Sequence, residues 1–313
     1  MTRAVFLMVL ALSLGACAEG RDPTPVGPVE TETPVAASPA ASVERSSDSL
    51  EIEAFYAKVE KDLLSRGLLR ADGGGPDTPF TDEMLARNFL AVAFSEEFSS
   101  AGGMIAARSR ASTLHRWTGP IEISVVFGET VTAPEREEMR TLVDTYAARL
   151  SRVTGHPIGT NRASGNFTVF VLHDQSLRAL GPELKARLPE ISGVEIDFVQ
   201  TLPLDAYCIV LTSDPDNTGR ISRAVAVIRA ELPRTLRTAC IHEDVAQGLG
   251  LANDSDLARP SIFKDDDEFG RLTTHDEMLL SILYNSGLAP GMTEAEAAPL
   301  VRQLARVLKA PGT

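Results

Sequence analysis

The sequence has little aromatic character, little positive charge and no long apolar run beyond its amino terminus. Aromatic residues make up 5% of the 313 residues, and 30 basic residues stand against 43 acidic ones, which gives a net charge of −13. A nucleic-acid binder normally carries a basic face or stripe, so this charge balance excludes that class. Outside the first seventeen residues, no apolar run approaches the ~20 residues that a membrane-spanning helix needs. The chain therefore crosses a membrane at most once.

The amino terminus has the layout of a secretory signal peptide. Arg3 precedes an apolar stretch at residues 5–14, which the sequence Leu14-Gly15-Ala16-Cys17 ends. A short transmembrane anchor is the alternative, but this stretch is too short to span a bilayer. The cysteine directly after Leu-Gly-Ala resembles the bacterial lipobox, which implies cleavage after residue 16 and a lipid on Cys17. With Ala18 next to it, the resemblance implies sorting to the periplasmic face of the outer membrane in the cell envelope.

The segment after the lipobox differs in composition from the rest of the chain. Residues 17–48 are rich in Pro, Ala, Ser and Thr and contain no aromatic residue. Such a segment cannot bury enough apolar surface to offset the entropy of ordering it, so we expect a disordered tether. Helical patterns at 48–69, 81–94 and 103–114 then predict an N-terminal helical region, residues 49–118, that packs on a main domain at residues 119–313.

The main domain alternates between strand and helix patterns. The fold class that we expect is α/β (α+β), with a mixed twisted sheet, a motif helix and C-terminal helices. The predicted strands are 121–127, 167–172, 207–211 and 224–228, and the predicted helices are 134–153, 176–188, 233–251, 273–285 and 293–308.

Two cysteines remain in this domain, Cys208 and Cys240. An even pair in an oxidising compartment predicts a disulfide, and two buried free thiols are the alternative.

The predicted motif helix carries the sequence CIHEDVAQGLGLAND at residues 240–254. His242-Glu243 matches the start of the zinc motif HExxH, but the position of the second histidine holds Ala246, which has no donor atom. A frame shifted by one residue resembles HExxHxxGxxHD, the motif of the metzincin zinc proteases. In that family three histidines bind zinc, the acidic residue activates water, and the glycine lets the chain turn. The residues at the six marked positions here are Glu243, Asp244, Gln247, Gly250, Asn253 and Asp254.

The sequence downstream of the motif extends this resemblance. Ser261-Ile262-Phe263 occupies the place of the tight turn under the metal. Leu272, Asp276, Leu280, Leu283 and Tyr284 resemble the closing helix of the matrix metalloproteases. The resemblance covers about residues 119–285 and implies a zincin-like or metzincin-like fold in which the zinc-binding histidines are replaced.

A second resemblance covers most of residues 80–305. The chain is similar to a proteobacterial lipoprotein family known only as a domain of unknown function. The similarity lies in residues 240–292 and in the short segments NFLAVAF, LHRW and VTGHPIG. This resemblance implies an envelope lipoprotein without an established activity.

The residues at the histidine positions are poor zinc ligands. Glu243 offers a carboxylate, but Gln247 and Asn253 offer only neutral amide oxygens, so we expect neither a tight zinc site nor a cofactor. A hard ion such as Ca²⁺ accepts such oxygens, and the acidic run at residues 265–268 lies close in sequence. That run lacks the spacing of a calcium loop, so we expect it to be a solvated loop.

These observations predict a catalytically inactive, metalloprotease-like domain that binds peptides or envelope proteins. One alternative is an active hydrolase with an atypical metal site, in which Glu243 or Asp244 polarises water. Another is a purely structural envelope protein. Because covered polar groups need partners, we expect Glu243, Gln247 and Asn253 to form a hydrogen-bonded network at the former metal position.

Overall fold

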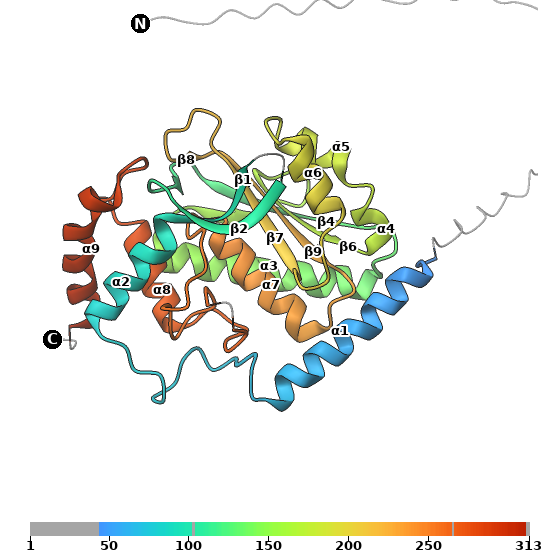
Figure 1. The fold of residues 1–313 in the computed structure, drawn as a ribbon, viewed down its shortest axis with the longest axis horizontal. Helices are drawn as coiled ribbons and strands as arrows, with labels where there is room; N and C mark the ends of the chain where they lie inside the picture. Colours follow the sequence, from blue (N-terminus) through green and yellow to red (C-terminus); the bar gives the residue numbers. More distant parts are fainter. Residues whose placement is uncertain (1–43, 102–103, 265, 311–313) are drawn as a thin grey trace, which may run out of the picture. The chain divides into compact units, whose positions relative to one another are not determined.

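The computed structural model describes residues 44–101, 104–264 and 266–310, and a five-stranded sheet lies at its centre (Figure 1). The strand order is β5-β4-β6-β9-β7. The first four strands are parallel to one another, whereas β7 runs antiparallel to β9 and forms one edge. The strands in this order are β5 (Ile158–Thr160), β4 (Ile121–Phe127), β6 (Phe167–Leu172), β9 (Arg223–Arg229) and β7 (Cys208–Ser213).

The central strands are apolar on both faces because helices cover both sides of the sheet. All six residues of β6 are buried, which is typical of a parallel strand with both faces covered. Val169 contributes to one apolar cluster together with the helices α3 (Ala133–Thr154) and α7 (Arg234–Gln247). Phe170 contributes to a second cluster, with α4 (Asp174–Leu177), α5 (Gly181–Arg187) and α6 (Gly193–Gln200).

The remaining helices pack around these layers (Figure 1). They are α1 (Ser47–Ser65), α2 (Asp82–Ala93), α8 (Thr274–Leu283) and α9 (Glu294–Lys309). Residues 42–313 form one compact unit, so the predicted N-terminal region and the main domain share it. Within the described residues, no helix combines the length and the apolar character that crossing a membrane requires.

Several helix ends lie where the sequence predicts them because short polar side chains cap them. Thr81 accepts a hydrogen bond from the backbone N–H of Met84 at the start of α2. A Thr132–Glu135 capping box starts α3, and Gly155 ends it with a φ of 65°. The mixed sheet and the helices on its two sides confirm the mixed α/β class, and the major elements of the main domain lie where the sequence predicts them.

The helix predicted at 103–114 is wrong. Strand β2 (Met104–Ala111) covers most of that range and pairs antiparallel with β1 (Ser95–Ala101). Gly102-Gly103, which lies outside the described residues, separates the two strands in sequence. The hydrogen bonds to β1 stabilise β2 as a strand. The spacing of apolar residues within 103–114 cannot show that a neighbouring segment supplies these bonds.

Other differences are smaller. The predicted helix at 176–188 is divided into α4 and α5, since Pro182 fits the first turn of a new helix. Helix α6 was not predicted, although Ser192 and Glu195 form a capping box at its start. Two short strands, β3 (Arg116–Trp117) and β8 (Arg220–Ile221), form a separate parallel pair.

Helix α1 begins at Ser47, within the last residues of the predicted tether. Cys17 and the rest of the leader lie outside the described residues.

The predicted disulfide between Cys208 and Cys240 is confirmed. It joins the first residue of β7 to the middle of α7, and the two Cα atoms lie 5.9 Å apart. The bridge therefore attaches the edge strand of the sheet to the helix that carries the motif.

Replacing both cysteines with alanine should lower the free energy of unfolding by about 3–4 kcal/mol, because the bridge closes a loop with a sequence separation of 32. Equilibrium urea unfolding of the oxidised protein measures this loss. Reducing the wild-type protein should reproduce it and leave the double variant unchanged. Equal unfolding midpoints for the oxidised wild type and the variant would contradict the prediction.

Candidate functional site

A cavity of about 270 Å³ lies between the edge strand β7 and helix α7. The residues on the β7 side are 205–210 and 212, and those on the α7 side are Ala239, Glu243, Asp244 and Gln247. The segment after α7 completes the lining with Ala252, Asp254, Ile262, Lys264, Asp267 and Phe269. Four of the six predicted motif positions and the middle residue of the predicted turn thus meet in one cavity.

Asp254 connects the two amides of the motif. The Gln247 side-chain NH₂ donates to Oδ1 of Asp254 over 3.0 Å, and the Asn253 side-chain NH₂ donates to the backbone oxygen of Asp254 over 2.6 Å. Asn253 also donates to the backbone oxygen of Ala91 on α2, over 3.1 Å. Gln247 and Asn253 are each only 5% exposed. Gln247 lines the cavity, whereas Asn253 does not. The two amides that the motif spacing assigns to one metal position therefore do not face the same cavity.

Gly250 allows the chain to turn back after α7. Its φ is +124°, a conformation that side chains disfavour, and a Cβ atom there would lie 2.1 Å from the backbone oxygen of His115. Two ring side chains hold the turn from outside. The indole N–H of Trp117 donates to the oxygen of Gly248 over 2.8 Å, and the Tyr284 hydroxyl donates to that of Leu249 over 3.0 Å. This turn returns residues 252 and 254 to the cavity.

A buried carboxylate shapes the segment Ser261-Ile262-Phe263. Asp276, at the start of α8, accepts from the Ser261 hydroxyl over 2.5 Å and from the backbone N–H of Ile262 over 3.1 Å. Thr273 donates to the same carboxylate through its hydroxyl and its backbone N–H. Asp276 and Phe263 are fully buried, and Ile262 reaches the cavity lining.

His242 does not line this cavity. Its ring stacks on Tyr146 of α3 at a centroid distance of 4.1 Å, and its Nδ1 accepts from the backbone N–H of Leu272 over 3.2 Å. Burial lowers the pKa of His242 to about 3, and the positive charges of Arg271 and Arg149 add to this effect. His242 and Glu243, which are neighbours in sequence, therefore line different cavities.

The charge of the cavity is negative. Five carboxylates and one ammonium line it, namely Asp205, Glu243, Asp244, Asp254 and Asp267 with Lys264. Asp205 and Lys264 have no local signal in the sequence, because separate loops bring them to the cavity. Among the described residues, no three His, Cys, Asp or Glu side chains are grouped in a way that could hold a metal ion.

The acidic run at residues 265–268 is not simply a solvated loop. Glu268 pairs with Arg259 at 2.6 Å and with Arg70 at 3.4 Å, and its side chain is 15% exposed. The hydrogen bond from Arg259 lowers the pKa of Glu268. Asp266 pairs with Lys264. The pair with Arg70 connects the run to a distant segment, which local spacing does not reveal. Asp265 lies outside the described residues.

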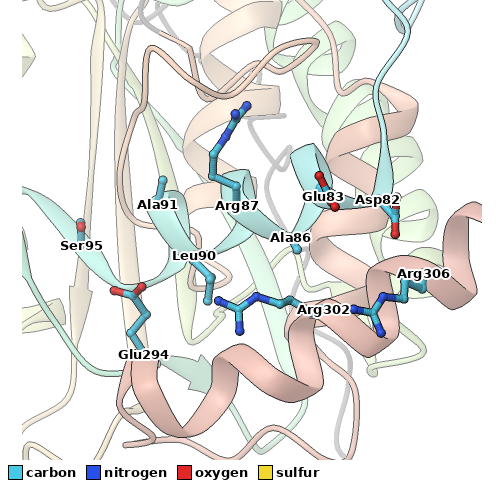
Figure 2. Close-up of a pocket in the computed structure, with 10 residues that line it drawn as sticks. All are labelled: Asp82, Glu83, Ala86, Arg87, Leu90, Ala91, Ser95, Glu294, Arg302 and Arg306. Atoms are coloured by element: carbon cyan, nitrogen blue, oxygen red, sulfur yellow. The ribbon is translucent and has the colours of Figure 1, made fainter.

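A separate cavity of about 540 Å³ lies between α2 and α9 (Figure 2). None of the predicted motif residues lines it. Its walls carry three arginines, Arg87, Arg302 and Arg306, together with three carboxylates, Asp82, Glu83 and Glu294. The charges balance, so this cavity does not indicate one ligand class.

Comparison with known proteins matches residues 82–303 to a family model described as a protein of unknown function (DUF2927). Neither the curated proteins nor the solved structures include a match to the chain.

Replacing Gln247 with leucine should lower the free energy of unfolding by about 1–3 kcal/mol, because Asp254 would lose a buried hydrogen-bond partner. Thermal or urea unfolding checks this. Gln200→Leu, at the end of α6, provides a control for the same substitution outside the motif. Unfolding of the Gln247 variant that matches the wild type would show that this hydrogen bond adds nothing to stability.

The pKa of about 3 predicts how stability depends on pH. Between pH 6.5 and 3 the unfolded chain binds a proton at His242 that the native protein does not, so this residue makes stability fall as the pH falls. His242→Gln keeps an acceptor for the Leu272 N–H but does not titrate. From pH 7 to pH 5, the wild type should lose about 2 kcal/mol more than this variant in urea unfolding. Parallel losses would contradict the low pKa.

Proposed function

The chain belongs to the family described as a protein of unknown function (DUF2927), and we propose that it is a catalytically inactive, metzincin-like lipoprotein that binds extended peptide segments in the cell envelope. The observation that carries the proposal is the acidic cavity along the edge strand β7. The lipid on Cys17 and the outer-membrane location rest on the leader sequence.

The edge strand supports peptide binding through backbone hydrogen bonds. Within the described residues β7 pairs only with β9, so its other edge presents backbone N–H and C=O groups to the cavity side. An extended peptide can add to such an edge as a further strand. The Cys208–Cys240 bridge keeps β7 and α7 together, so the cleft is preorganised and loses little entropy on binding.

The charge of the cleft favours basic peptides. With five carboxylates and one lysine in the lining, a Lys or Arg side chain of the ligand would lie in a negative potential. We therefore propose that the ligand is an extended segment of an envelope protein with basic residues on alternate positions, since alternate side chains of a strand point to the same face.

The residues at the metzincin positions support binding rather than hydrolysis. Gln247 and Asn253 supply amides where that family has imidazoles, and both amides are committed to hydrogen bonds within the protein. The positive φ of Gly250 and the place of Ile262 in the cavity lining support the metzincin-like part of the proposal.

A hydrolase remains the alternative because Glu243 and Asp244 line the same cavity. This alternative requires stoichiometric metal in the purified protein and peptide cleavage that Glu243→Ala abolishes. A purely structural role requires that no peptide binds.

Fluorescence anisotropy with labelled octapeptides tests the proposal. A peptide with lysine on alternate positions should bind at least tenfold more tightly than the same peptide with glutamate, because only the first complements the cleft. Substituting a central residue with proline should weaken binding at least tenfold, because proline removes a backbone donor. Glu243→Gln should weaken binding of the lysine peptide about threefold or more, whereas the matched control Glu294→Gln, on α9, should not. Equal affinity for both peptides, or no affinity for either, would refute the proposal.

A further inference from the structure

A further cavity, of about 400 Å³, lies on the α3 side of α7, away from the lining of the acidic cleft. Its walls come from α3, from α7 and from the segments at residues 71–73 and 271–274. A neighbouring cavity of about 440 Å³ continues along α3 toward the start of α7. Arg271 lines both cavities, so its side chain lies where they adjoin.

The carboxylates around these cavities are already paired with other arginines. The pairs are Asp72 with Arg70 at 2.7 Å, Glu137 with Arg140 at 3.8 Å, Glu277 with Arg149 at 2.8 Å, and Glu138 with Arg234. Within the described part of the chain, Arg271 donates no hydrogen bond, forms no ion pair and stacks on no aromatic ring. It is therefore an uncompensated cation in a protein whose net charge is −13.

The surroundings of Arg271 repel its charge. Partial burial removes water from the guanidinium, and the positive charges of Arg234 and Arg149 act on it; together these effects lower the pKa of Arg271. A cation placed among cations costs free energy unless an anion joins them. The arrangement is thus unfavourable for the empty protein and favourable for a bound anion.

His242 adds a neutral donor to the same cavity. Its Nδ1 accepts from the Leu272 N–H, so the ring proton lies on Nε2. Nε2 donates to no described residue, and the ring, which is 4% exposed, lines the cavity. This N–H can therefore donate to a ligand atom in the cavity.

We propose that the cavity between α3 and α7 binds a small oxyanion, with the guanidinium of Arg271 and the Nε2–H of His242 as donors. A planar guanidinium matches two oxygens of a phosphate or carboxylate group, and the neutral imidazole supplies a third hydrogen bond. Arg149 contributes long-range attraction while it remains paired with Glu277. This site lies on a different side of α7 from the acidic cleft, so it does not depend on peptide binding.

Titration of the full chain with inorganic phosphate at constant ionic strength tests the inference. Calorimetry measures affinity, and ¹⁵N NMR follows the His242 Nε2–H. In the wild type, phosphate should bind and shift the Nε2–H resonance, whereas chloride at the same ionic strength should not. Sulfate and acetate in parallel titrations distinguish a phosphate-type ligand from a carboxylate.

Arg271→Ala should weaken binding of the preferred anion at least tenfold, since a hydrogen-bonded charge pair is lost. Arg271→Lys, which keeps the charge but not the fork geometry, should weaken it less. Arg302→Ala, on α9 in the wall of the cavity between α2 and α9 (Figure 2), is a control for the same loss of charge and should not change it. Without anion, Arg271→Ala should unfold at the same or a higher urea concentration than the wild type, because it removes a repelled cation.

Two results would overturn the inference. One is the absence of binding for every oxyanion beyond the effect of chloride. The other is equal weakening by Arg271→Ala and Arg302→Ala, which would show that the anions respond only to net charge. If Arg271→Ala instead lowers the stability of the anion-free protein, Arg271 has a structural role and the inference also fails.

Discussion

Both proposed sites depend on how α7 is held against the sheet. Proline at the start of α7 provides no side-chain cap, and Glu60 of α1 accepts hydrogen bonds from the backbone N–H groups of Thr235 and Leu236 instead. The disulfide at Cys240 attaches the middle of the helix to β7. Trp117 binds the carbonyl of Gly248 at its end. Contacts from three distant segments thus fix the axial position and the rotation of one helix.

This fixed rotation explains why neighbouring residues of α7 serve different cavities. Successive side chains on a helix point about 100° apart. His242 therefore packs on Tyr146 of α3, whereas Glu243 and Asp244 line the cleft beside β7. One side of the helix borders a lining rich in carboxylates and another borders a lining with a surplus of arginine. The opposite charges remain apart because the apolar body of α7, including the fully buried Val245, lies in the core between them.

The major elements of the sheet and its helices follow from local signals. Strand β6 is an uninterrupted apolar run, and the caps at Thr81 and Thr132 mark helix starts through bonds that span three residues. Pairing with another strand gives no such signal within the strand itself, which is why β2, the partner of β1, was predicted as a helix. The separation of Asn253 from the cleft is also non-local, because the backbone oxygen of Ala91 on α2 helps to orient it.

The sequence by itself determined the α/β class, the disulfide partners and the residue types at the motif positions, because these follow from composition, periodicity and spacing along the chain. Only the tertiary structure decided which motif residues share a cavity, that β7 lies at the edge of the sheet, and that Arg271 has no carboxylate partner among the residues that the structure describes. The physical reason is that electrostatic compensation depends on which neighbours a side chain has in space. Glu277 serves Arg149 and Glu138 serves Arg234, and no rule of sequence spacing assigns these partners.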